Sequence, residues 1–175
     1  MTHYDFPKQF RALYDHAVGL YASGKRGAET YFTAEERQFL QANGLTVQNL
    51  YDYAEDHNGY AGDPGPEQAL AIELVRRDYF LNPQEGRPSA TVLDDTSMPA
   101  KTDTVRGIAW LPRLIPKAHA KLRGELPPNL MYCCGGDRSF FREHNILPAE
   151  FLTLVWRHEN RPDAIVDWVV RRAQA

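Results

Sequence analysis

Cysteine is scarce in this sequence: its 175 residues include only Cys133 and Cys134, and these two are adjacent. A disulfide framework requires several spaced cysteines, so none is predicted. The six histidines show neither Cys-x-x-Cys nor His-x-x-x-His ligand spacing, and no metal site is predicted. The sequence also lacks a glycine-rich phosphate loop, the order of a catalytic triad and a recognisable pair of catalytic carboxylates. We therefore predict no cofactor.

Long apolar runs and an excess of one charge are lacking as well. No apolar run approaches the roughly 20 residues that span a bilayer. The N-terminal residues MTHYDFPKQF do not form the basic and apolar regions of a signal peptide. A net charge of -3 gives no basic footprint for nucleic acid or anionic lipid. These features predict a soluble, cytoplasmic protein that binds neither nucleic acid nor membranes.

An internal repeat becomes visible when the chain is shifted by 101 residues. The shift holds without a gap over about 48 residues, and conservative pairs lie between the identical ones. Chance similarity between amphipathic helices would give scattered matches with several different shifts, so a single shift favours duplication. The identical pairs are Leu13 and Leu114, Ala17 and Ala118, Tyr31 and Tyr132, Arg37 and Arg138, Phe39 and Phe140, and His57 and His158.

Both copies show the periodicity of helices. Apolar residues recur at the spacing of one helical face over residues 10–21 and again over 111–122. Thr33 and Glu36 form the pattern of a capping box, and Thr46 is a second N-cap. Pro66, Pro148 and Pro162 suit first helical turns, and Asp137 is expected to open a helix to His144. Pro116 lies inside an apolar pattern, which predicts a short turn or a kink there. No convincing strand is found; Thr91 to Leu93 is the best extended stretch.

The repeat predicts an all-α protein built of two related four-helix units. Residues 1–83 would form a degenerate first copy and residues 107–175 the second copy. Residues 84–106 are rich in Pro, Ser, Thr and Asp and poor in aromatic residues, which indicates a linker. A linker of this length lets the copies pair around an approximate two-fold axis. We therefore expect a monomer that forms an internal pseudo-dimer.

The second copy contains the densest polar cluster of the chain, between Leu111 and Phe141. It resembles a bacterial domain-of-unknown-function family, number 5069, whose members are short helical domains without an established activity. The resemblance covers the C-terminal 40% well and the first copy weakly. The chain departs from the family pattern at Pro116, His119 and Gly135-Gly136. The resemblance rests on Leu111-Pro112-Arg113-Leu114-Ile115, Lys117-Ala118, Gly124, Tyr132, Cys134, Asp137 and Phe140-Phe141.

Two interpretations of this cluster remain open at the sequence level. Cys134 precedes the helix that Asp137 is expected to open, and a helix N-terminus with nearby cations favours a thiolate. Alternatively, Cys134 is a small buried residue and Asp137 a charge at the helix N-terminus. Arg113 and Lys117, four residues apart, form either an anion site or a salt bridge to Asp137.

We therefore expect a non-enzymatic binding or interaction module, with a surface for an unknown small molecule or protein in the second copy. The alternative is an enzyme that uses Cys134 as a readily ionised thiolate, while Arg113 and Lys117 hold an anionic substrate. The expected site residues are Arg113, Lys117, His119, Tyr132, Cys134 and Asp137.

Overall fold

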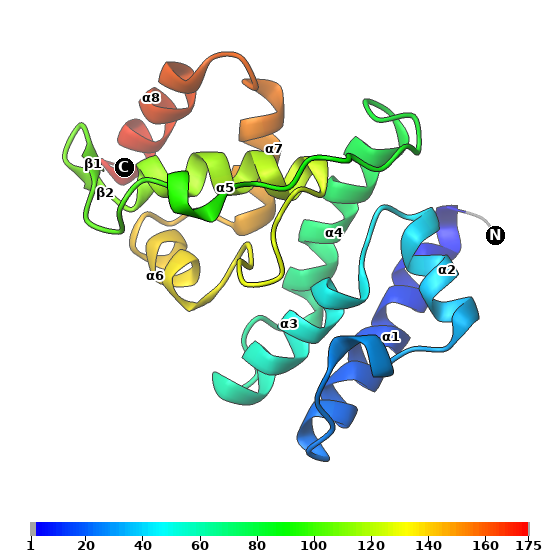
Figure 1. The fold of residues 1–175 in the computed structure, drawn as a ribbon. Helices are drawn as coiled ribbons and strands as arrows, with labels where there is room; N and C mark the ends of the chain where they lie inside the picture. Colours follow the sequence, from blue (N-terminus) through cyan, green and yellow to red (C-terminus); the bar gives the residue numbers. More distant parts are fainter. Residues whose placement is uncertain (1–2, 175) are drawn as a thin grey trace. The chain divides into compact units, whose positions relative to one another are not determined.

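A computed structural model describes residues 3–174 of the chain. These residues form eight α-helices and one small antiparallel sheet, which confirms the predicted all-α class (Figure 1). The chain divides into two compact units, Met1–Gly86 and Arg87–Ala175. Each unit contains four of the helices.

The first unit is organised around its longest helix, α1. This helix packs against α3 and α4 through a face that includes Phe10, Leu13 and Ala17, all of them buried. The apolar spacing read from the sequence therefore marks the buried face of α1. The helices of this unit are α1 (Phe6–Ala22), α2 (Ala34–Ala42), α3 (Val47–Gly59) and α4 (Pro66–Leu81), with short 3-10 turns at His3–Asp5 and Ala28–Thr30.

The N-termini of α2 and α3 are capped as the sequence predicts. The Thr33 hydroxyl accepts a hydrogen bond from the backbone N–H of Glu36, and the Glu36 carboxylate accepts one from the N–H of Thr33. Thr46 and Asn49 form the same reciprocal pair at α3. Each pair satisfies two of the N–H groups that a helix start leaves without a partner.

In the second unit, α5 packs against α7, and α7 against α8. Residues before α5 form a two-stranded hairpin in which Thr104 pairs with Ala109. The sequence did not indicate this hairpin, because its strands have two residues each and show no alternation. The elements are β1 (Thr104–Val105), β2 (Ile108–Ala109), α5 (Leu111–Arg123), α6 (Gly135–Glu143), α7 (Pro148–Arg157) and α8 (Pro162–Ala173).

Pro116 lies inside α5, which runs continuously from Leu111 to Arg123. The short separate turn considered at residues 111–115 is therefore absent. Pro112 occupies the first helical turn, where a missing N–H costs nothing, and Pro116 leaves only the carbonyl one turn before it without a helical donor. As a result, Arg113 and Lys117 lie on one helix.

The segment expected to be a linker is held to the second unit after Gly86. The backbone N–H of Leu93 donates to the carbonyl of Glu125, and the Ser89 hydroxyl donates to the Glu125 carboxylate. The side-chain amide of Asn129 donates to the carboxylate of Asp95. These contacts place residues 89–95 on the loop that follows α5.

Helix boundaries recur at the spacing of the sequence repeat. The helices α2 and α6 begin at residues 34 and 135, and α3 and α7 at residues 47 and 148, which is 101 residues apart in both cases. Both units also repeat one arginine contact. Arg37 donates to the carbonyl of Phe32 and Arg138 to that of Cys133, and each carbonyl belongs to the residue before the N-cap.

Within residues 3–174, no helix combines the length and apolar character needed to cross a membrane.

Candidate functional site

A buried ion pair lies at the centre of the second unit's polar cluster. Lys117, on α5, places its Nζ 2.9 Å from both carboxylate oxygens of Asp137, in the first turn of α6. The Lys117 side chain is 2% exposed and that of Asp137 is not exposed at all. The salt bridge considered from the sequence is therefore formed. In such a setting each charge depends on its partner, because neither is solvated by water.

Two further donors complete the shell of Asp137. The indole Nε1–H of Trp110 donates to Oδ1 at 2.9 Å, and the backbone N–H of Cys133 donates to Oδ2 at 2.8 Å. Each carboxylate oxygen thus accepts one hydrogen bond from Lys117 and one from a neutral donor. The carboxylate is therefore hydrogen-bonded at both oxygens and fixed in position by three different donor groups.

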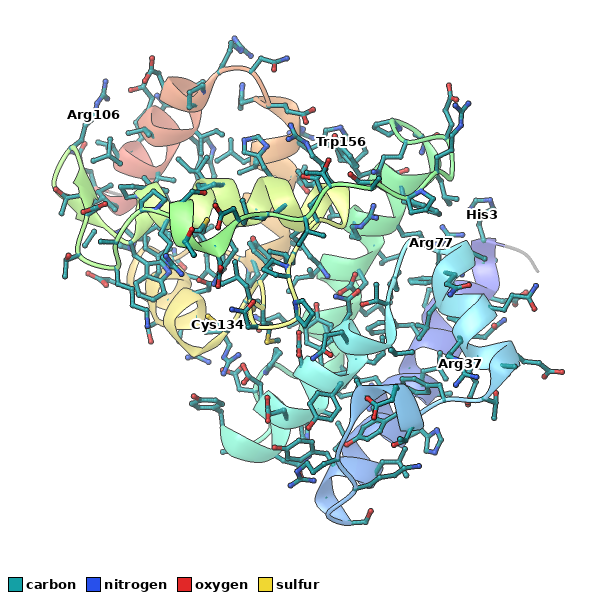
Figure 2. All side chains as sticks on the ribbon, in the orientation of Figure 1. His3, Arg37, Arg77, Arg106, Cys134 and Trp156 are labelled. Carbon is teal, nitrogen blue, oxygen red and sulfur yellow. The ribbon has the colours of Figure 1, made fainter. Side chains whose placement is uncertain are left out.

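Cys134 lies beside this pair, where the loop enters α6 (Figure 2). Its Sγ is 3.3 Å from Lys117 Nζ, so the three N–H bonds of the ammonium meet three acceptors: two oxygens and one sulfur. Cys134 is half-buried, whereas the neighbouring Cys133 is completely buried. Of the two residues, only Cys134 is partly exposed.

The segments that enter α5 and α6 each contain a non-glycine residue with a positive φ. Trp110 has a φ of 68° and Cys133 a φ of 69°. Such conformations are uncommon for residues with side chains and need support from their surroundings. Each residue receives support from Asp137, to which both donate. The carboxylate therefore fixes the entry to α5 as well as the entry to α6.

Gly136 makes room for the indole ring in this arrangement. A Cβ at this position would lie 2.5 Å from two carbon atoms of the Trp110 ring. A side chain here would therefore move the ring away from Asp137. The second glycine of the Gly-Gly pair is thus a requirement of packing.

Among the residues that the structure describes, three of those predicted for the site form no hydrogen bond or ion pair with Lys117 or Asp137. Arg113 donates to the carbonyl of Pro99 at 2.8 Å. Tyr132 is buried and donates to the carbonyl of Pro148, and burial raises the pKa of its phenol. His119 is half-buried; burial, followed by the charge of Arg123, lowers the pKa of its imidazole. Only Lys117, Cys134 and Asp137 of the predicted set come together.

Trp110 is the member of the cluster that sequence reasoning missed. A tryptophan before a helix has no pattern in the sequence that indicates a hydrogen bond. Its role depends on a left-handed φ and on a contact 27 residues away in the chain. The only available signal was its position directly before the Leu-Pro-Arg-Leu stretch.

The first unit contains a related arrangement at the positions equivalent to the cluster. His16 on α1 takes the place of Lys117, with Nδ1 3.8 Å from the carboxylate of Glu36 on α2. Thr33, the N-cap of α2, takes the place of Cys134. This pair is more exposed than Lys117 and Asp137: the side chains of His16 and Glu36 are 47% and 30% exposed.

No metal centre is found among the described residues: no three side chains of His, Cys, Asp or Glu in residues 3–174 are grouped so that they could hold an ion. Comparisons with protein-family models, with curated proteins and with solved structures gave no match.

Proposed function

We propose that this protein is a non-enzymatic binding module whose ligand surface lies in the second unit, around the Lys117–Asp137–Cys134 cluster. The observation that carries the proposal is the internal pairing of Lys117 and Asp137, both buried and both fully hydrogen-bonded. A catalytic acid or base needs a proton position that reaches substrate, whereas this pair uses its positions to fix two helix starts. The cluster therefore acts as the structural support beneath the proposed ligand surface.

The ligand would contact two half-buried residues of the second unit: Cys134 in the cluster, and Arg113, which precedes Lys117 by four residues on α5. Arg113 forms one hydrogen bond to a carbonyl, and within residues 3–174 it has no carboxylate partner. A guanidinium has five N–H donors in a planar fork that matches a carboxylate or phosphate. This favours a small molecule or a protein segment with an anionic group at Arg113.

The proposal is tested by native mass spectrometry of the protein as purified from its own source, to detect what copurifies. We expect a bound species that is lost in Arg113→Ala. Arg106→Ala is the matched control. Arg106 lies in the hairpin of the same unit (Figure 2) and forms an exposed ion pair with Asp167. Equal binding by the wild type and both variants would contradict a surface centred on Arg113.

The second candidate is an enzyme with Cys134 as nucleophile. It is favoured by the 3.3 Å contact between Lys117 Nζ and Cys134 Sγ and by the partial exposure of this cysteine. Against it, Asp137 shares the same ammonium and opposes a second negative charge. We expect slow alkylation by iodoacetamide at neutral pH. Rapid alkylation of Cys134 alone would place the enzyme first.

We further propose that the chain arose by duplication and forms an internal pseudo-dimer. The equal spacing of the helix starts and the repeated Arg37 and Arg138 contacts support it. The resemblance of the second copy to family 5069 is also a proposal, supported by the meeting of its motif residues Lys117, Cys134 and Asp137. An experimental structure of a family member should show the same lysine–aspartate–cysteine contact.

A further inference from the structure

One nucleophilic contact is not used by the proposed binding function. Lys117 Nζ and Cys134 Sγ come from different elements, α5 and the N-cap of α6, and are in direct contact at 3.3 Å. Lys117 is 1% exposed, so its amine is held in place. Cys134 is half-buried, so part of the residue is open to solvent. A partly exposed cysteine thus faces a fixed amine.

We propose that this pair is a redox modification site: oxidation of Cys134 by a peroxide is followed by a covalent S–N bond between Cys134 and Lys117. The group that reacts with the oxidised sulfur is therefore a lysine of the same chain. The site shares Cys134 with the proposed ligand surface, but the crosslink is detected as a covalent product and does not require binding at Arg113, so either proposal can fail without the other.

The first step oxidises the sulfur. The Cys134 thiol attacks one oxygen of hydrogen peroxide, the O–O bond breaks, and sulfenic acid and water are formed. Sulfur loses two electrons and the peroxide gains them. The new hydroxyl lies on a sulfur that already accepts a hydrogen bond from Lys117.

The second step is a condensation that needs no further oxidant. The Lys117 ammonium gives one proton to Asp137, whose oxygens lie at 2.9 Å, and its free electron pair attacks Sγ. The S–O bond breaks, and the oxygen leaves as water with a second proton from nitrogen. Sulfenic acids condense with nitrogen nucleophiles in this way. The products are a sulfenamide and a neutral, protonated Asp137.

Burial of the site favours this outcome over persistence of the sulfenic acid. The reaction converts a buried ammonium and a buried carboxylate into neutral groups, which removes the desolvation penalty of both charges. Lys117 also needs little movement, because its four-carbon stem already places nitrogen against sulfur. The competing partner, Cys133, is completely buried in a left-handed turn, and a disulfide between adjacent cysteines is strained.

The test treats the full-length protein with one equivalent of hydrogen peroxide at neutral pH, followed by tryptic peptide mapping. We expect a linked pair of peptides containing Lys117 and Cys134, lighter than their sum by about 2 Da, the mass of two hydrogens lost in a sulfenamide. Trypsin should no longer cleave after Lys117. Dithiothreitol should restore the two separate peptides, since a thiol reduces the S–N bond.

Variants separate the crosslink from other oxidation products. Cys133→Ala should still form it. Lys117→Arg should lose it and, when a second equivalent of peroxide is added, accumulate sulfinic acid at Cys134. If Lys117→Arg does not fold, the wild-type peptide map decides by itself. The proposal would be overturned by a disulfide between the two cysteines as the main wild-type product, or by a bridge about 14 Da heavier than the sum of the two peptides, which retains an oxygen. A wild-type protein that gives sulfinic acid in place of the crosslink when a second equivalent of peroxide is added would also overturn it.

Discussion

Asp137 is the residue on which the candidate site depends most. Because it is buried and neutralises a buried lysine, Asp137→Asn would leave the Lys117 ammonium without its counter-charge. Removing one partner of a buried pair typically costs about 3–5 kcal/mol. We expect a loss of this size in the free energy of unfolding, measured by urea denaturation.

The Arg106–Asp167 ion pair provides the control for this prediction. It belongs to the same unit, but both side chains are substantially exposed, 57% and 41%. Pairs of this kind contribute about 0–1 kcal/mol, so Asp167→Asn should change stability little. Equal losses of unfolding free energy in the two variants would show that burial does not make the Lys117–Asp137 pair more important for stability than an exposed pair.

His119 should make the stability of the second unit depend on pH. Burial and Arg123 lower the pKa of its imidazole in the folded state, while Glu159 acts in the opposite direction. The unfolded chain therefore binds more protons than the folded one below the ordinary histidine pKa of about 6.5. Stability should fall as the pH decreases from that value. Comparing wild type with His119→Gln by thermal unfolding at pH 7.5 and 5.5 checks this, and the variant should lose less.

At the residue scale, the sequence identified a polar cluster but not its full composition. Lys117 and Asp137 could be paired from their helical positions and charges. The hydrogen bond from Arg113 to the carbonyl of Pro99 could not be predicted, since it depends on the position of the segment before α5. Trp110 was equally out of reach, because left-handed φ values at residues with side chains have no signature in a single sequence.

Among the elements, the start of α6 is the most constrained. Gly136→Ala should improve helix propensity, yet a Cβ there would lie 2.5 Å from the Trp110 ring. We therefore expect the variant to be destabilised, because the indole must leave Asp137. Thermal unfolding followed by circular dichroism, and a change in tryptophan fluorescence, would report it.

Gly19 in α1 is the matched glycine. No atom lies within 4 Å of a Cβ built on it, and its backbone is helical. Gly19→Ala should therefore stabilise the protein by about 0.5–1 kcal/mol, the usual gain in a helix interior. If Gly136→Ala gave the same gain, the contact with Trp110 would not constrain α6.

The N-caps of α2 and α6 differ in a way that a substitution can test. Thr33 caps α2 through its hydroxyl, whereas Cys134 forms no side-chain cap bond at α6. Serine is a preferred N-cap, so Cys134→Ser should fold normally, with stability equal to wild type or above it. Thr33→Ala should lose about 1 kcal/mol. Circular dichroism and urea denaturation measure both, and a poorly folded Cys134→Ser would assign the thiol a structural role.

Helices were predicted well because their signals are local. Caps at Thr33 and Thr46 and prolines at residues 66, 148 and 162 mark the observed starts. The start of α6 was placed two residues late, since Gly135 and Gly136 are poor helix formers whose place depends on Trp110. The hairpin at residues 104–109 was missed, because strands of two residues carry no period.

At the scale of the whole molecule, the duplication proposal predicts the oligomeric state. If two related units complete each other within one chain, no second chain is needed to cover their apolar faces. We expect light scattering to give the mass of a monomer, 20.0 kDa, over a wide range of concentration. A stable dimer would show that the units leave an interface open.

The contacts of the cluster are confined to residues 110–137, and this affects the order in which the second unit can assemble. Trp110 and Lys117 reach Asp137 across 27 and 20 residues, and Cys134 follows Lys117 by 17. The entropy cost of closing a loop rises with its length, so contacts across 17 to 27 residues cost less than contacts across the whole unit. The meeting of α5 with α6 can therefore precede the docking of α7 and α8, which would make the ion pair an early nucleus of the second unit.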